Sequence, residues 1–294
     1  MKKKLKAVIP ICFVFPALLL LGFFVFYPLV ENFINSLYNF SNFSPERTYV
    51  GLENIKKIFA DSTVSVALLN NLRYALVSVV LQVFIALILA AVLEQRFMHK
   101  TASFYRIVYF MPVMISISVV ALLFSFIYNP QMGILNSFLK AVGLGDLARP
   151  WLGRSDTAIY AVIAMSQWQS IGYIMLLFIV AIQKIPGDLY EAAQIDGANK
   201  IRTFFSVTVP QVKEAIFVNT LITIIGSMLV FSEPFILTKG GGPGISSITI
   251  AVHMYEEGFV KDNMGYASAL AALIFVITAV VSLIQVIVSK TGKE

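Results

Sequence analysis

The sequence predicts an all-α, polytopic membrane protein with six transmembrane helices and one short helix on the cytoplasmic side. The chain of 294 residues is 58% hydrophobic and only 13% charged, and its mean hydropathy is +0.82. A water-soluble core cannot absorb that much apolar surface, so composition places the chain among membrane proteins. The apolar residues also gather into long runs that polar segments separate. We therefore expect one transmembrane domain over residues 1–294.

Six of these runs are long enough to cross about 30 Å of hydrocarbon as helices. The predicted spans are residues 7–30, 67–93, 105–127, 157–183, 214–237 and 264–288. The first run follows a lysine-rich start and is longer than the apolar part of a typical signal peptide, which indicates a retained anchor. Because the number of spans is even, both termini are expected on the same side of the membrane.

The positive residues indicate which side that is. More than half of the 22 Lys and Arg residues fall in segments 1–6, 94–106, 184–214 and 289–294, which together are shorter than the opposite loops. Positively charged loops tend to remain in the cytoplasm, so both termini and the polar segment 184–214 are predicted to be cytoplasmic. The same rule accounts for the formal net charge of +6, and no nucleic-acid partner is expected.

The segment 184–214 contains a predicted helix of about two turns. Asp188 and Glu191 have the spacing of a capping box at a helix start. Gly197 suits a left-handed residue just beyond a helix end. A helix this short is not stable by itself in water, so we expect it to pack on a partner surface. An ordinary amphipathic loop helix would show the same local pattern.

This segment resembles the EAA loop of ABC-importer permeases, which docks on a cytoplasmic ATPase. In that pattern Glu-Ala-Ala is followed by a glycine and then by an apolar-x-apolar-Pro ending. The matching residues here are Glu191, Ala192, Ala193, Gly197, Val207, Val209 and Pro210. The resemblance implies that 184–214 is a cytoplasmic coupling loop within a permease domain. The ATPase-coupling residues that it implies are Glu191, Ala192, Ala193, Asp196 and Gly197.

Further motifs resemble one branch of this family, the carbohydrate-uptake permeases of the maltose and glycerol-phosphate type. They comprise residues 50–54, 133–136, 237–243 and 265–269, with Arg106 and Pro112. In that branch a Gly-Gly-Pro stretch in an external loop is typical of the first of two paired permeases. The residues of this stretch are Gly240, Gly241, Gly242 and Pro243. A flexible external turn would use the same residues, and both interpretations can hold.

The resemblance implies a bacterial or archaeal inner-membrane permease subunit of an ATP-driven importer for an oligosaccharide or glycoside. It implies as partners a second homologous permease, two cytoplasmic ABC ATPase subunits and an extracytoplasmic sugar-binding protein, besides membrane lipid. The chain has no Gly-rich phosphate loop, so we expect no enzymatic activity and no cofactor in it, with ATP and Mg²⁺ held by the partner ATPase. The single cysteine and two isolated histidines lack metal-ligand spacing, so no metal site is expected.

Two other classes of transporter remain open at this point. An ABC permease for amino acids or peptides would share the loop and differ in the branch-specific motifs. A secondary transporter driven by an ion gradient would also have apolar spans. The sparse charges within the spans and the short cytoplasmic helix argue against the secondary transporter.

Polar side chains on two spans predict a substrate path, because polar groups in lipid tend to face a bundle interior or a water-filled path. The fourth span carries Ser166, Gln169, Ser170 and Tyr173 on one helical face, and the fifth carries Asn219, Thr223 and Ser227, with Phe231 and Glu233 near its outer end. Hydroxyls, amides and aromatic rings suit a neutral sugar. Helix–helix hydrogen bonding is the alternative for the two stripes, and a position at the outer water boundary is the alternative for Glu233.

Overall fold

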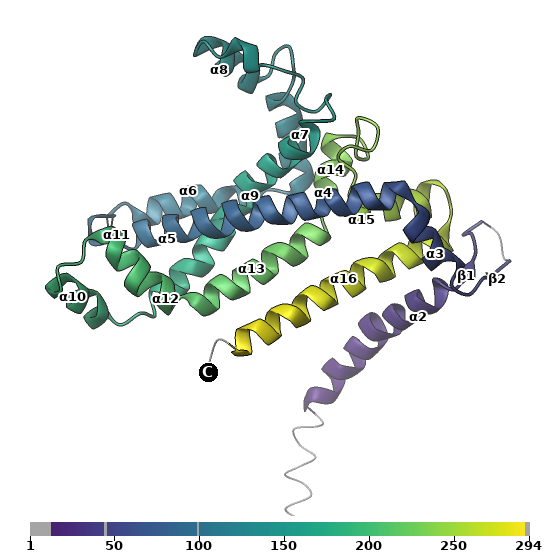
Figure 1. The fold of residues 1–294 in the computed structure, drawn as a ribbon, viewed down its shortest axis with the longest axis horizontal. Coiled ribbons are helices and arrows are strands. Elements are labelled where there is room, and N and C mark those ends of the chain that lie inside the picture. Colours follow the sequence, from purple (N-terminus) through teal and green to yellow (C-terminus); the bar gives the residue numbers. More distant parts are fainter. Residues whose placement is uncertain (1–12, 44–45, 99, 292–294) are drawn as a thin grey trace, which may run out of the picture. The chain divides into compact units, whose positions relative to one another are not determined.

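The computed structural model describes residues 13–43, 46–98 and 100–291, and these are mostly helical, with very little strand (Figure 1). Residues 7–12 of the first predicted span lie outside the described residues. The two chain ends, which we predict to be cytoplasmic, also lie outside the described residues. The chain divides into two compact units. The first consists of Met1–Asp61 and Met254–Phe275, and the second of Ser62–His253 and Val276–Glu294, each as far as it is described.

Long apolar helices confirm the predicted class of fold. Four single helices in the described residues are long and apolar enough to cross a membrane: Phe13–Asn35, Ser62–Leu93, Ala158–Ile182 and Met264–Ile287. A fifth candidate is the pair Ala102–Met114 and Ile117–Ile127, which is bent by 97°. The predicted span 214–237 is interrupted and consists of α13 (Lys213–Met228) and α14 (Ser232–Leu237). The described residues thus contain four or five candidate spans where the sequence predicts six.

The bend in the third predicted span has a local cause. α6 (Ala102–Met114) ends because Ile115 and Ser116 have extended backbones, with ψ of 136° and 135°. Pro112 lies inside the last turn of α6 and has no N–H to donate to the preceding turn, which weakens the helix at this point. α7 (Ile117–Ile127) then starts in a new direction.

The first unit combines helices with a short antiparallel hairpin. Its elements are the π-helical turn Gly22–Phe26, α2 (Tyr27–Asn35), β1 (Tyr38–Asn39), β2 (Thr48–Tyr49), α3 (Glu53–Ala60), the π-helical turn Glu256–Val260 and the first part of α16 (Met264–Thr291). In the hairpin Tyr38 pairs with Tyr49. Asn54 Nδ2 donates to the carbonyl oxygens of Ser36 and Tyr38, both at 3.0 Å. The motif 50–54 is therefore part of the frame of this unit.

The second unit is a helical bundle around α9 (Ala158–Ile182). Its other elements are α4 (Ser62–Ser78), the π-helical turn Val79–Ile85, α5 (Ala86–Leu93), the 3₁₀ turn Arg96–Met98, α6, α7, α8 (Ile134–Ala141), the 3₁₀ turn Gly145–Leu147, α10 (Gly187–Ile195), α11 (Lys200–Thr203), the π-helical turn Phe204–Thr208, α12 (Val209–Gln211), α13, α14 and most of α15 (Ile250–Tyr255). α9 packs against α4, α5 and α6, and α13 packs against α4 (Figure 1).

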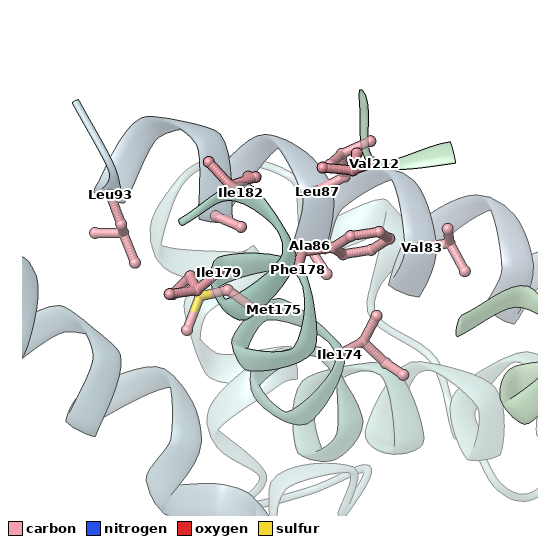
Figure 2. Close-up of a cluster of buried hydrophobic side chains, with 11 residues drawn as sticks. Val83, Ala86, Leu87, Leu93, Ile174, Met175, Phe178, Ile179, Ile182 and Val212 are labelled. Carbon is pink, nitrogen blue, oxygen red and sulfur yellow. The ribbon is translucent and has the colours of Figure 1, made fainter. Parts of the chain in front are cut away.

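A cluster of buried side chains lies where α9 meets α5. Met175 and Phe178 of α9 are fully buried beside Ala86 and Leu87 of α5, and Val212, which follows α12, joins the same cluster (Figure 2). Lipid is as apolar as these side chains, so close van der Waals packing rather than removal from water holds such helices together in a membrane. The shape of the cluster therefore matters more than its apolar area.

α9 approaches α6 most closely at Gly172. A methyl group at this position would overlap the carbonyl oxygen of Tyr109 in α6. Small residues at helix contacts in membranes permit this kind of close backbone approach. Gly172 therefore sets the spacing between α9 and the first half of the bent pair.

We predict that Gly172→Ala lowers the thermal stability of the detergent-solubilised protein, because overpacking a tight contact typically costs about 1–3 kcal/mol. The measurement is the temperature at which half of the protein is lost from the monodisperse peak in size-exclusion chromatography. Gly226→Ala is the matched control, since nothing lies within 4 Å of a methyl group at that helical glycine. Equal melting of the two variants would contradict the close approach at Gly172.

Candidate functional site

α10 (Gly187–Ile195) ends in a turn closed by a left-handed glycine. Gly197 has a φ of +74°, which confirms the predicted conformation and which residues with a Cβ rarely adopt. The N–H of Gly197 donates to the carbonyl of Gln194 at 3.0 Å, and the N–H of Ala198 donates to that of Ala193 at 2.9 Å. These two bonds make a Schellman motif. Gly197 therefore sets the direction in which the chain leaves α10.

The predicted capping box at the start of α10 is wrong. The helix begins at Gly187, directly after Pro186, and no side chain caps it. Asp188 consequently lies inside the first turn and not at the cap position. Proline fixes φ near the value that this start needs, so the helix begins earlier than the Asp188 to Glu191 spacing indicates. The negative charge of Asp188 still favours the helix, because it lies beside the free N–H groups of the N-terminus.

The chain returns from α10 through a second capped turn. Asn199 Oδ1 accepts a hydrogen bond from the backbone N–H of Arg202 at 2.8 Å and so caps α11. The hydroxyl oxygens of Tyr190 and Thr208 lie 3.2 Å apart, which connects α10 with the turn that follows α11. One side of α10 is thus fixed to the rest of its loop.

The predicted coupling residues lie largely on the open side of this loop. Ala193 is half-buried, and the exposed ones are Glu191, Ala192, Asp196 and Gly197. Two large apolar side chains are exposed beside them, Ile195 at 87% and Ile201 at 71%. Exposed isoleucines next to small residues make a surface that another protein can cover. The role of these residues in coupling stays a prediction.

The stripe predicted on the fourth span divides between the interior and the surface of α9. Ser166 and Gln169 are buried, Ser170 is half-buried, and Tyr173 is 41% exposed. Gln169 Nε2 donates to the carbonyl of Ile115 at 3.1 Å, which the break after α6 leaves without a helical partner. Gln169 therefore holds the bent pair, and Tyr173 is the member of the stripe that reaches the surface.

The stripe predicted on the fifth span is buried on one face of α13. Asn219, Thr223 and Ser227 are all less than 7% exposed. Ser227 Oγ donates to the carbonyl of Thr223 at 2.7 Å, and Asn71 Nδ2 of α4 donates to the carbonyl of Ser227 at 2.6 Å. Within the part of the chain that the structure describes, Asn219 Nδ2 and the Thr223 hydroxyl have no hydrogen-bond partner. Ser227 therefore takes part in contacts within the bundle, while the other two keep unused polar groups.

Phe231 and Glu233 lie where α13 gives way to α14. The ring of Phe231 stacks on that of Phe235, with centroids 4.9 Å apart. Glu233 is half-buried, and its Oε1 accepts a hydrogen bond from the hydroxyl of Tyr74 in α4 at 3.4 Å. The carboxyl group of Glu233 is therefore partly open and also linked to a neighbouring helix.

The Gly-Gly-Pro stretch forms a loop that internal hydrogen bonds stabilise. Ser247 Oγ makes hydrogen bonds to Thr238 Oγ1 and to the carbonyl of Gly242, both at 2.8 Å. Gly241 is buried with a φ of +102°, and a methyl group there would lie 2.6 Å from the Cα of Ile248. The predicted loop thus has a defined fold over Gly240, Gly241, Gly242 and Pro243. At Gly241 both the positive φ and the close approach to Ile248 require glycine.

Two adjacent asparagines of α4 hold this loop, and our sequence analysis missed them. Asn70 Nδ2 donates to the carbonyls of Ser246 and Ile248, both at 2.9 Å. Asn71 Oδ1 accepts from the backbone N–H of Ile250 at 3.0 Å. Both side chains are fully buried. The signal that could have found them is a pair of neighbouring amides inside a predicted apolar span.

Comparisons with known proteins identify one family. A family model for the inner membrane component of binding-protein-dependent transport systems matches residues 82–291. A probable ABC transporter permease protein of Bacillus subtilis, YurN, is 53% identical over 98% of both chains. The arabinooligosaccharides transport system permease protein AraP of Halalkalibacterium halodurans is 30% identical over 98% of this chain and 89% of its own.

A solved structure shares the fold. It is that of a bacterial alginate ABC transporter in complex with an alginate pentasaccharide-bound periplasmic protein. One of its chains matches with a TM-score of 0.83 at 21% identity, over 97% of this chain and 94% of its own. The residues of this chain that the family model matches include α10 and its glycine turn. The chain therefore belongs to the family of binding-protein-dependent transport system inner membrane components, the permeases of ABC transporters.

Proposed function

We propose that this chain is a permease subunit of an ATP-driven sugar importer, forming half of the translocation path and coupling it to a cytoplasmic ATPase. The observation that carries the proposal is α10, a short exposed helix whose left-handed end at Gly197 belongs to the EAA pattern. A permease of this family is not an enzyme. ATP and Mg²⁺ are bound by two partner ATPase subunits, and a second permease completes the path.

A sugar is the substrate class that we favour. Support comes from AraP, whose name assigns it to arabinooligosaccharide transport, and from the uncharged polar groups on α9 and α13. Such groups donate and accept hydrogen bonds without the charge that an amino acid or an ion would call for. An extracytoplasmic binding protein that delivers the sugar follows from the family.

Transport energetics test this function. We expect right-side-out membrane vesicles with the complete importer to take up a radiolabelled oligosaccharide from a panel that includes arabino-oligosaccharides, and to need internal ATP for it. Vesicles without this chain are the control. Uptake that persists after ATP depletion in vesicles energised by a respiratory substrate would favour a secondary transporter. ATP-dependent uptake of only a labelled dipeptide or amino acid would show the rival ABC substrate class.

Six transmembrane segments and a cytoplasmic α10 complete the proposal. We add α13 and α14 together, as a sixth span, to the five candidate spans. α13 alone has 16 residues and reaches about 24 Å at 1.5 Å per residue, so α14 is needed to approach about 30 Å. This arrangement places both termini and the loop 184–214 in the cytoplasm. Closure of the ATPase subunits on ATP then pushes on α10 and opens the path outward, and hydrolysis resets it.

The substrate path in this proposal runs along the surface side of α9. Ser170 and Tyr173 are the members of the α9 stripe that are not fully buried, and Glu233 has a partly open carboxyl group. Asn219 and Thr223 contribute their unused polar groups if the bundle opens toward them. The facing surface of the second permease supplies the other side of the path.

We predict that Gly197→Asp leaves the permease inserted but reduces transport and the retention of ATPase subunits during affinity purification. A residue with a Cβ is strained at this φ, so the chain after α10 is misdirected. Gly187→Asp is the matched control, because this glycine is equally exposed, has no left-handed φ and has nothing within 4 Å of an added Cβ. Normal ATPase retention in Gly197→Asp would contradict both the coupling role and the cytoplasmic placement of α10.

We predict that Tyr173→Ala raises the sugar concentration for half-maximal uptake several-fold without changing basal ATP hydrolysis of the complex. A lost hydrogen bond typically costs about 0.5–1.5 kcal/mol, which weakens binding but does not abolish it. Tyr160→Ala is the control, because this tyrosine of α9 is also exposed, at 50%, and lies on another face of the helix. Equal effects of the two substitutions on uptake would place the path elsewhere.

A further inference from the structure

Glu94 and Phe97, which follow α5, contact the chain on both sides of α10. Before α10, Gln183 Nε2 donates to both carboxylate oxygens of Glu94 at 3.3 Å. After α10, Lys200 Nζ lies 4.5 Å from the ring centroid of Phe97. Gln183 directly follows α9, and Lys200 begins α11. The chain entering α10 and the chain leaving it therefore both contact the short segment after α5.

Glu94 also contacts α6. Its carboxylate forms an ion pair with Arg106, which lies in the second turn of α6. The pair is mostly shielded, with 18% of the Glu94 side chain and 30% of the Arg106 side chain exposed. Removal of one member of a shielded pair leaves an uncompensated charge, so the pair resists separation. We call these residues, Glu94, Arg106 and Gln183, the helix-end triad.

α6 leads from the triad to the broken span. Three residues after Arg106, the carbonyl of Tyr109 lies against Gly172 of α9. α6 then ends at Met114, and Gln169 of α9 holds the next carbonyl, that of Ile115. α9 therefore holds α6 at two points, one before and one after Pro112.

We propose that the helix-end triad is a positioning device that converts movement of α10 into movement of α6 and of the bend at Ile115. Glu94 and Arg106 act through α6 and touch neither substrate nor ATP. This inference rests on the proposed coupling role of α10 and adds the residues through which the coupling leaves the loop. A purely structural staple would use the same contacts and would not affect how much sugar is moved per ATP.

The test measures sugar transported per ATP hydrolysed by the purified, reconstituted importer. We expect Arg106→Gln to lower this ratio at least about fivefold, the lower end of typical couplings between sites, with ATPase subunits retained. The charge-exchanged double variant, Glu94→Arg with Arg106→Glu, is expected to recover at least half of the ratio. Arg154→Gln is the control, since it breaks an exposed Arg–Asp pair with Asp156 at 2.9 Å that joins no helices.

Gln183→Ala is the second variant, because it removes one contact of the triad without leaving a charge unpaired. It is expected to lower the ratio at least about twofold, and it decides the matter if Arg106→Gln cannot be purified. A normal ratio in either purified variant, or loss of ATPase subunits as in Gly197→Asp, would overturn the inference. Failure of the unmodified importer to couple uptake to ATP would instead refute the proposed function.

Discussion

The close packing of α9 against α5 and α6 is the constraint on which the second unit depends. Apolar side chains gain little free energy when they leave lipid for a helix contact, because lipid is equally apolar. The fit of the packed surfaces therefore decides which helices associate. Phe178 and Met175 fill the space beside α5, and Gly172 lets α6 approach until backbone meets backbone. α10 follows α9 after a few residues, so the position of the loop helix depends on the same contacts.

Satisfaction of free backbone carbonyls is the second constraint, since a membrane interior supplies no water to them. The two breaks within predicted spans, between α6 and α7 and between α13 and α14, are matched by amides or a hydroxyl from elsewhere in the chain. Gln169 serves Ile115 at the bend, and Thr249 Oγ1 donates to the carbonyl of Val230 between α13 and α14 at 2.8 Å. Asn71 serves the end of α13. The breaks are therefore parts of the fold that distant residues stabilise.

α10 contrasts with this closed interior. Its carbonyls are satisfied within its own turn at Gly197, while its outer face leaves Ile195 and neighbouring small residues exposed. A helix of nine residues has little stability by itself in water, which fits the partner surface that we propose for it. The helix-end triad connects the end of α9, from which the chain enters α10, with α6 through charged and polar groups. Exposure on one side and polar links on the other suit an element that receives movement and passes it inward.

The sequence by itself determined the membrane class, the helical fold, the α10 loop and its left-handed glycine, because apolar length and turn chemistry are local properties. It predicted the start of α10 wrongly, since the helix begins at Gly187, directly after Pro186, and Asp188 does not cap it. Only the tertiary structure decided that the span after Ala102 bends at Ile115, that Gln169 holds the bend, and that Asn70 anchors the glycine loop. These features depend on which distant group reaches a free carbonyl, and helical spacing alone does not contain that information.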